Sequence, residues 1–121
     1  MKERAFDLED RLIAFAVHVI RTAEALPKTV TGNHIRSQLL RSGTSPAPNY
    51  GEAQSAESRS DFAHKLKIVL KELRETRVWL LIILRAAIIK PVTVLDPLLK
   101  ENNELISIFV ASLKTAAKVR G

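Results

Sequence analysis

The chain of 121 residues contains no cysteine, which excludes disulfide bonds and thiolate metal sites and fits a reducing compartment. Aromatic residues make up only 5% of it, and its four glycines are too scattered to form a glycine-rich phosphate loop. The longest apolar stretch, residues 78–89, is interrupted by Arg85 and is shorter than the roughly 20 residues that span a membrane. Residues 1–4 lack the form of a signal peptide, so we expect a cytoplasmic protein.

The composition is that of a folded protein. Hydrophobic residues account for 46% of the chain and charged residues for 26%, as in a globular domain rather than a disordered segment. A chain of this length can bury a core without disulfides or metals. Helical periodicity appears in four segments, and no strand-type alternation competes with it. We therefore expect one all-α domain over residues 1–121.

The first and last segments carry clear helix signals. Asp7 is a good N-cap for the first helix, with Asp10 in the place of a capping-box acid, and Pro27 stops the helix. Asp96 and Pro97 mark the start of the last helix as an N-cap followed by proline. The predicted inner faces are Leu8, Leu12, Phe15, Ala16, Val19, Ala23 and Leu26 for the first helix, and Leu99, Ile106, Phe109, Leu113 and Ala116 for the last.

The second segment, which starts near residues 31–33, runs into a stretch rich in proline and glycine. Pro46, Pro48 and Gly51 follow one another closely, and local rules predict a loop there. A helix that the prolines bend is the competing interpretation, because neighbouring helices can hold a kinked helix in place. The residues alone leave both interpretations open.

The third segment gives the strongest signal. After Ser60, which can cap a helix, apolar residues recur at steps of four and three over about 26 residues, and Pro91 marks the end. Residues 78–84 are apolar on every side, and three partner helices would leave part of that surface exposed, so we expect self-association there. Four helices with short links predict an antiparallel up-down four-helix bundle with a long third helix. The predicted seam is Phe62, Leu66, Val69, Leu73, Thr76, Leu80, Ile83 and Ala87.

Positive charge is concentrated in the middle of the sequence. The net charge is +6, and the segment from Lys28 to Lys90 holds 11 Lys/Arg and 5 Asp/Glu, while the rest of the chain is balanced. Such a concentration favours an anionic partner, of which nucleic acid is the commonest. A merely solvated surface is the competing interpretation.

No constellation of catalytic or metal-binding residues emerges. The three histidines lie far apart in the sequence and have no metal-ligand spacing. Glu72 and Glu75 are spaced like paired carboxylates, but the cations around them favour surface ion pairs. We therefore expect no enzyme, no cofactor and no metal.

A basic stripe is the main candidate for binding. Lys67, Lys71 and Arg74 step by four and three residues, so they share one side of the third helix, away from the apolar seam, and Arg77 extends the stripe. A basic stripe with few aromatic residues suits phosphate contacts rather than stacking on bases. The candidate nucleic-acid-binding residues are Arg36, Arg41, Arg59, Lys67, Lys71, Arg74 and Arg77.

Several short stretches in the middle of the chain belong to a known pattern. They are Gln38-Leu39-Leu40-Arg41-Ser42-Gly43-Thr44-Ser45, Asn49-Tyr50, Glu52-Ala53, Ser58-Arg59-Ser60-Asp61-Phe62, Lys65-Leu66, Ile68-Val69, Glu75-Thr76 and Trp79-Leu80. Together they resemble the 23S rRNA intervening-sequence proteins, also called four-helix bundle proteins. The likeness covers roughly positions 6–90, and the fourth helix matches only in character. Pro46 and Pro48 together depart from the family pattern.

The resemblance implies an architecture more than an activity. It implies a second helix that continues through the proline region with a bend, and a homopentamer with a central opening. It also implies a polar cluster of Arg41, Ser45, Asn49 and Glu52, which can be a structural network that holds the kinked helix. The accessory proteins of diversity-generating retroelements resemble this family in fold, charge and pentameric ring, and they bind a reverse transcriptase and its template RNA.

Two functions follow as hypotheses. The first is a non-catalytic oligomer that binds nucleic acid, with RNA as the expected partner, through its basic surface. The alternative is a protein-docking ring, such as an accessory subunit for a reverse transcriptase of a diversity-generating retroelement. In both cases the protein is expected to associate with itself, as a homopentamer, and not with a membrane.

Overall fold

The described chain consists of helices. A computed structural model describes residues 2–120, and the side chains of residues 7–118 within them. Apart from one short 3-10 turn, the regular elements are α-helices, and no strand occurs in this part of the chain. The elements are α1 (Lys2–Glu24), α2 (Val30–Thr44), α3 (Pro46–Gln54), α4 (Arg59–Arg85), η1 (Val92–Leu95) and α5 (Asp96–Arg120).

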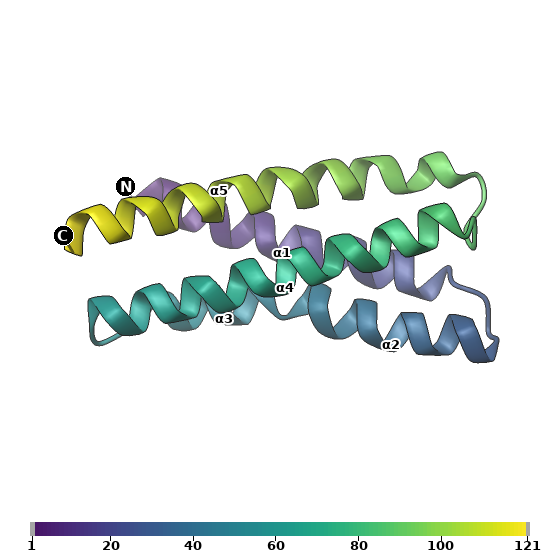
Figure 1. Ribbon diagram of the computed structural model, residues 1–121, viewed down its shortest axis with the longest axis horizontal. Coiled ribbons are helices and arrows are strands. Elements are labelled where there is room, and N and C mark those ends of the chain that lie inside the picture. The colour runs from purple at the N-terminus through teal and green to yellow at the C-terminus, as the bar shows by residue number, and fades with distance from the viewer. Residues whose placement is uncertain (1, 121) are drawn as a thin grey trace.

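The helices form an antiparallel four-helix bundle in which α2 and α3 together make up one arm (Figure 1). α4 packs against α5 on one side and against α2 and α3 on the other, whereas α1 packs against α2, α3 and α5. α1 and α4 therefore lie at diagonally opposite corners and run in the same direction. With 27 residues, α4 is the longest described helix. The predicted all-α bundle with a long third helix is confirmed.

The proline-rich stretch is helical, so the kinked-helix interpretation is confirmed and the loop interpretation is wrong. Ser45, between α2 and α3, keeps helical dihedral angles (φ −71°, ψ −35°). Pro46 and Pro48 fall in the first turn of α3, where backbone N–H groups have no partner within the helix and proline is tolerated. The Asn49 N–H then donates to the Ser45 carbonyl at 3.2 Å. The chain therefore bends at Ser45 without leaving the bundle.

Three helices begin earlier than predicted. α1 starts at Lys2, so Asp7 lies inside the helix and does not cap it. At the other two starts, a hydroxyl side chain two residues earlier than predicted accepts a hydrogen bond from a backbone N–H at 3.0 Å. Because neighbouring Ser and Thr residues offer the same chemistry, the sequence pattern does not separate them. The observed caps are Thr29 for α2 and Ser58 for α4, in place of residues 31–33 and Ser60.

The end of α4 is set by the backbone and not by Pro91. The helix stops at Arg85, and Ala87 adopts a left-handed conformation with φ of 52°. The Ile88 N–H donates to the Ile83 carbonyl at 3.1 Å, the closing hydrogen bond of a Schellman motif. Alanine occupies the position that glycine usually fills there, so the turn carries some backbone strain.

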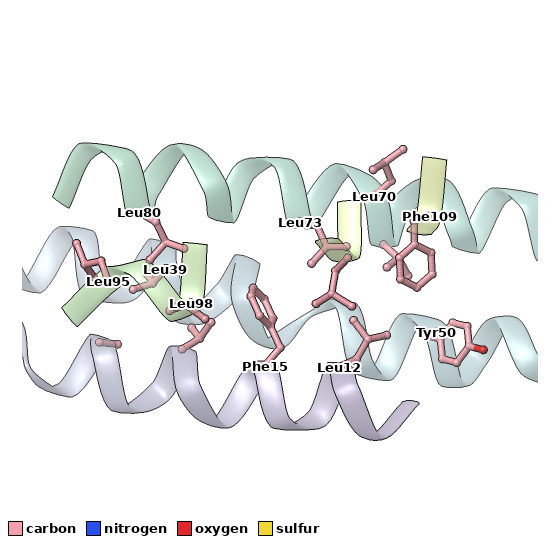
Figure 2. Close-up of a cluster of buried hydrophobic side chains, with 14 of the residues drawn as sticks. Leu12, Phe15, Leu39, Tyr50, Leu70, Leu73, Leu80, Leu95, Leu98 and Phe109 are labelled. Carbon is pink, nitrogen blue, oxygen red and sulfur yellow. The ribbon is translucent and has the colours of Figure 1, made fainter. Parts of the chain in front are cut away.

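A continuous apolar core runs along the bundle (Figure 2). α1 contributes Leu12 and Phe15, α4 contributes Leu73 and Leu80, and α5 contributes Phe109. The predicted inner faces of the first and third helices are confirmed, because all their members are buried or half-buried. Their buried members are Leu12, Phe15, Val19, Ala23, Leu26, Leu66, Val69, Leu73, Thr76, Leu80 and Ile83.

The inner face of α5 is rotated from the predicted one. Its buried residues are Leu98, Leu105, Phe109 and the polar Asn102. The Asn102 amide donates to the Leu73 carbonyl of α4 at 3.1 Å, while its Oδ1 has no partner among the described residues. Because Asn102 is polar, the apolar pattern of the sequence does not reveal this buried face of α5. The predicted residues Leu99, Ile106, Leu113 and Ala116 are half-buried beside it.

Two kinds of feature are absent from the described residues. None of their helices is both long and apolar enough to cross a membrane. They contain no group of three or more His, Asp or Glu side chains that could hold a metal ion. Of the three histidines, His34 packs edge-on against the ring of Trp79, with the ring centroids 5.9 Å apart.

Candidate nucleic-acid interface

The outward side of α4 presents a row of cations. Lys67, Lys71 and Arg74 are all exposed, and helical periodicity places them on one stripe opposite the buried seam. Arg77 is exposed at the edge of this stripe, where its Nε donates to the Asn103 Oδ1 of α5 at 3.1 Å. We call Lys67, Lys71, Arg74 and Arg77 the α4 row. The structure thus brings together four of the seven predicted binding residues.

The carboxylates of the same part of α4 point to the other side. Glu72 and Glu75 are the acidic residues between positions 62 and 85. Arg41 of α2 donates to the Glu72 Oε2 at 3.2 Å and also forms an ion pair with Glu75. The indole N–H of Trp79 donates to the Glu75 Oε2 at 3.1 Å. These contacts draw the negative charge of α4 toward α2 and leave the α4 row without compensation from its own helix.

Arg41 therefore lies at the seam between α2 and α4, where its charge is already paired. Its guanidinium binds both carboxylates across the seam and also the Gln38 side chain at 3.1 Å. Glu72 is nearly buried, and a buried carboxylate requires a partner. A phosphate that recruited Arg41 would have to displace that partner.

Arg36 is likewise committed to the fold. Its Nε donates to the Ala23 carbonyl at 3.0 Å, and its Nη2 donates to the Leu26 carbonyl at 2.6 Å and the Pro27 carbonyl at 3.2 Å. These carbonyls lie at the C-terminal end of α1, where backbone acceptors lack helical partners and a cation is favourable. Arg36 thus caps α1, and its guanidinium is already engaged in the fold.

Arg59 lies apart from the α4 row. It is the first residue of α4 and is exposed, eight residues before Lys67. That separation corresponds to about 12 Å along the helix. Arg59 therefore marks one end of the helix rather than the middle of the row.

The polar cluster implied by the family resemblance falls into three separate groups. Arg41 binds across the seam, as described above. The Asn49 amide donates to the Ser45 carbonyl at 3.0 Å and to its hydroxyl at 2.9 Å, which braces the bend between α2 and α3. Glu52 accepts from the Lys65 ammonium of α4 at 2.6 Å, and this hydrogen bond raises the pKa of Lys65. All three groups hold the kinked arm in place, which favours the structural interpretation.

Exposed apolar residues form two further surfaces at opposite corners of the bundle. Val78, 52% exposed, and Ile82 continue the outward side of α4 beyond the α4 row. Ile13, Val17 and Ile20 form an exposed stripe on α1 that the sequence analysis missed, although their spacing of four and three residues could have revealed it. A groove beside the stripe is lined by Ala14, Val17, His18, Arg21, Thr22, Ala25, Ile89 and Val94.

The sequence of this bundle matches a known family. The model of the 23S rRNA-intervening sequence protein family matches residues 5–111, from α1 to most of α5. The chain belongs to this family. The match includes the α4 row, the kinked arm and the seam that Arg41 forms between them.

A similar solved structure supports the assignment. The chain is similar to a protein of unknown function from the S23 ribosomal protein family of Bacteroides thetaiotaomicron VPI-5482. The two share 31% sequence identity with a TM-score of 0.80, over 91% of this chain and 97% of the other. No curated protein matches this chain. Membership of the 23S rRNA-intervening sequence protein family thus fixes the fold and leaves the activity to be argued from the surface.

Proposed function

We propose that this member of the 23S rRNA-intervening sequence protein family is a non-catalytic, cytoplasmic oligomer. It binds nucleic acid through the α4 row, and RNA is the expected ligand. The observation that carries the proposal is the separation of charge across α4. Glu72 and Glu75 are held by Arg41, whereas Lys67, Lys71 and Arg74 face solvent. Such a row attracts phosphate groups and releases their counterions.

The binding should be weakly selective for sequence. Lysine and arginine contacts to phosphates position a nucleic acid, while base edges and stacked bases carry sequence information. Trp79 bonds to Glu75 on the seam side, and Phe109 is in the core. The α4 row therefore contains cations but no aromatic ring on which a base could stack.

Self-association is the second part of the proposal. The exposed apolar stripe on α1 and the apolar end of the outward side of α4 support it, because a second copy could cover surfaces that the bundle leaves exposed. Since these two surfaces differ and lie at opposite corners, a head-to-tail contact between them would be heterologous and could close into a ring. A ring agrees with the homopentamer that the family resemblance implies.

The test is a salt-dependent binding titration. Fluorescently labelled structured RNA is titrated with the protein and with a Lys67→Glu/Lys71→Glu/Arg74→Glu variant, at about 50 and 200 mM salt. Three phosphate contacts predict that wild-type affinity falls roughly 20- to 40-fold between the two salt concentrations, and that the variant loses binding.

A matched control separates this row from net charge. Arg21→Glu/Lys28→Glu/Lys90→Glu reverses the same number of exposed cations at the end of the bundle where α1 stops. The control should keep the wild-type affinity, and sedimentation should show the same oligomeric state for all three proteins. Binding that is insensitive to salt, or equal in the row variant and the control, would contradict the proposal.

Protein docking is the competing function, for example to a reverse transcriptase. The observation that favours it is the apolar groove beside the α1 stripe, which includes the cationic Arg21. A stoichiometric protein complex that survives nuclease treatment and is unaffected in the α4-row variant would favour docking. A complex that nuclease abolishes would exclude it.

A further inference from the structure

A second row of cations lies beside the first, on α5. The hydrogen bond between Arg77 and Asn103 places Asn103 at the edge of α5 that adjoins the outward side of α4. Lys100 precedes Asn103 by three residues and Lys114 follows it by eleven, which is close to three full turns, so all three share one side of α5. Lys118 follows Lys114 by one further turn. Lys100, Lys114 and Lys118, which we call the α5 row, are exposed.

One of the two acidic residues near this row points away from it. Glu101 and Glu104 are the acidic residues between positions 97 and 120. Arg11 of α1 donates to both oxygens of Glu101, at 3.0 and 2.6 Å, and lies 3.5 Å from Glu104. The contact raises the pKa of Arg11, chiefly through the hydrogen bond to Glu101. Arg11 thus holds Glu101 away from the α5 row, as Arg41 holds two carboxylates away from the α4 row. Glu104 is exposed four residues after Lys100, on the side of the lysines.

The two rows are level at Lys67 and Lys114. Lys67 precedes Arg77 by ten residues, or about 15 Å of helix, and Lys114 follows Asn103 by eleven, or about 16 Å in the same direction, because the helices are antiparallel. Packed helices are about 8–10 Å apart. Cations of α4 and α5 therefore lie about one helix diameter apart at both ends of the α4 row, at Lys67 and Lys114 and near Arg77 and Lys100.

The geometry points to a ligand with two phosphate backbones. We infer that α4 and α5 together bind double-stranded A-form RNA, with one row of cations on each backbone beside its major groove. This inference rests on the proposed function and names its substrate class. A single strand offers one line of phosphates, and its binders stack bases on aromatic side chains, which these rows lack. The major groove of A-form RNA is deep and narrow and brings its two backbones close together, whereas that of B-DNA is about 12 Å wide.

The test compares three ligands and three variants by fluorescence anisotropy. The ligands are an RNA duplex of about 20 base pairs, one of its strands alone, and the DNA duplex of the same sequence. Variants carry Lys67→Gln/Lys71→Gln/Arg74→Gln in the α4 row, Lys100→Gln/Lys114→Gln/Lys118→Gln in the α5 row, or Lys28→Gln/Lys90→Gln as a control away from both rows. All substituted residues are exposed, and circular dichroism and sedimentation confirm fold and assembly.

We expect the RNA duplex to bind at least tenfold more tightly than either other ligand. Each row variant should weaken duplex binding by up to about eightfold per cation at about 0.1 M salt, and the control should leave it unchanged. If the α4-row variant loses binding and the α5-row variant keeps it, the proposed function stands and the two-helix surface is wrong. Equal or tighter binding of the single strand or the DNA duplex overturns the assignment to A-form RNA. Loss of binding in the control alone, or no binding of any ligand, overturns both proposals.

Discussion

The two sides of α4 differ in how their charged side chains are paired. Toward α2 and α3, carboxylates and cations meet in pairs, with Arg41 between Glu72 and Glu75 and Lys65 on Glu52. Toward solvent, the α4 row presents cations whose neighbouring carboxylates have been drawn to the seam. The comparison teaches that a helix of mixed composition can still present charge of one sign, provided that a neighbouring helix supplies partners for the other sign.

The largest effect should come from the close contact between α1 and α2. A Cβ added at Gly43 would lie 2.5 Å from Cγ1 and 2.7 Å from Cγ2 of Val19, so Gly43→Ala should destabilise the protein by about 1–3 kcal/mol. A Cβ at Gly51 in α3 would meet nothing within 4 Å, and Gly51→Ala should stabilise the helix by about 0.5–1 kcal/mol. Urea unfolding of the two variants measures the contrast. Equal effects of the same sign would contradict it.

A smaller effect should distinguish the ion pairs between α2 and α4 from the solvent-facing α4 row. Arg41→Ala leaves the nearly buried Glu72 without its cation and should cost about 1–2 kcal/mol, a value kept low because Arg41 is half exposed to solvent. Lys71 is exposed on the other side of α4, so Lys71→Ala should change the free energy of unfolding by less than about 0.5 kcal/mol.

Thermal or urea unfolding at low and moderate salt would measure both variants. RNA affinity should reverse their order, because Lys71→Ala should weaken binding while Arg41→Ala should leave it close to wild type. A loss of affinity in Arg41→Ala without a change in stability would return Arg41 to the interface.

The smallest effect concerns the buried side of α3 and appears only in alkali. Burial raises the pKa of Tyr50, which packs edge-on against Phe109. Above the ordinary tyrosine pKa of about 10, the unfolded chain releases this proton while the folded chain keeps it, so stability should fall as the pH rises toward the folded pKa. Tyr50→Phe should lack this fall, and the difference between the two curves removes the shared titration of the lysines.

Because the chain has one tyrosine, its ultraviolet titration also reports Tyr50 alone. The folded protein should ionise at a higher pH than the protein in urea. Identical midpoints would show that Tyr50 is not protected by the core.

Periodicity in the sequence was enough to predict most of the fold. Steps of three and four residues located the seam of α4 and the buried face of α1, because those faces are apolar throughout. The face of α5 was missed by one residue position, since Asn102 occupies a core position by donating to a carbonyl on another helix. The caps at Thr29 and Ser58 were missed because nearby hydroxyl residues have the same capping ability.

The candidate interface could be predicted only in part. The α4 row follows from spacing within one helix, and the sequence predicted it. The roles of Arg36 and Arg41 depend on carbonyls and carboxylates of other segments, which spacing does not reveal. The α5 row was hidden because the chain outside residues 28–90 is neutral in sum, and only the fold shows that Glu101 is held by Arg11, 90 positions away.

The buried amide of Asn102 has a consequence for how the surface would meet a rigid ligand. Sliding α5 along α4 by one turn, about 5.4 Å, would remove the amide from the Leu73 carbonyl and leave the amide without a partner in the core. The axial offset between the two helices is thus locked when the chain folds. A stiff, periodic polymer would then encounter lysines whose spacing is already set, and association would lose less conformational entropy than it would on a flexible basic tail.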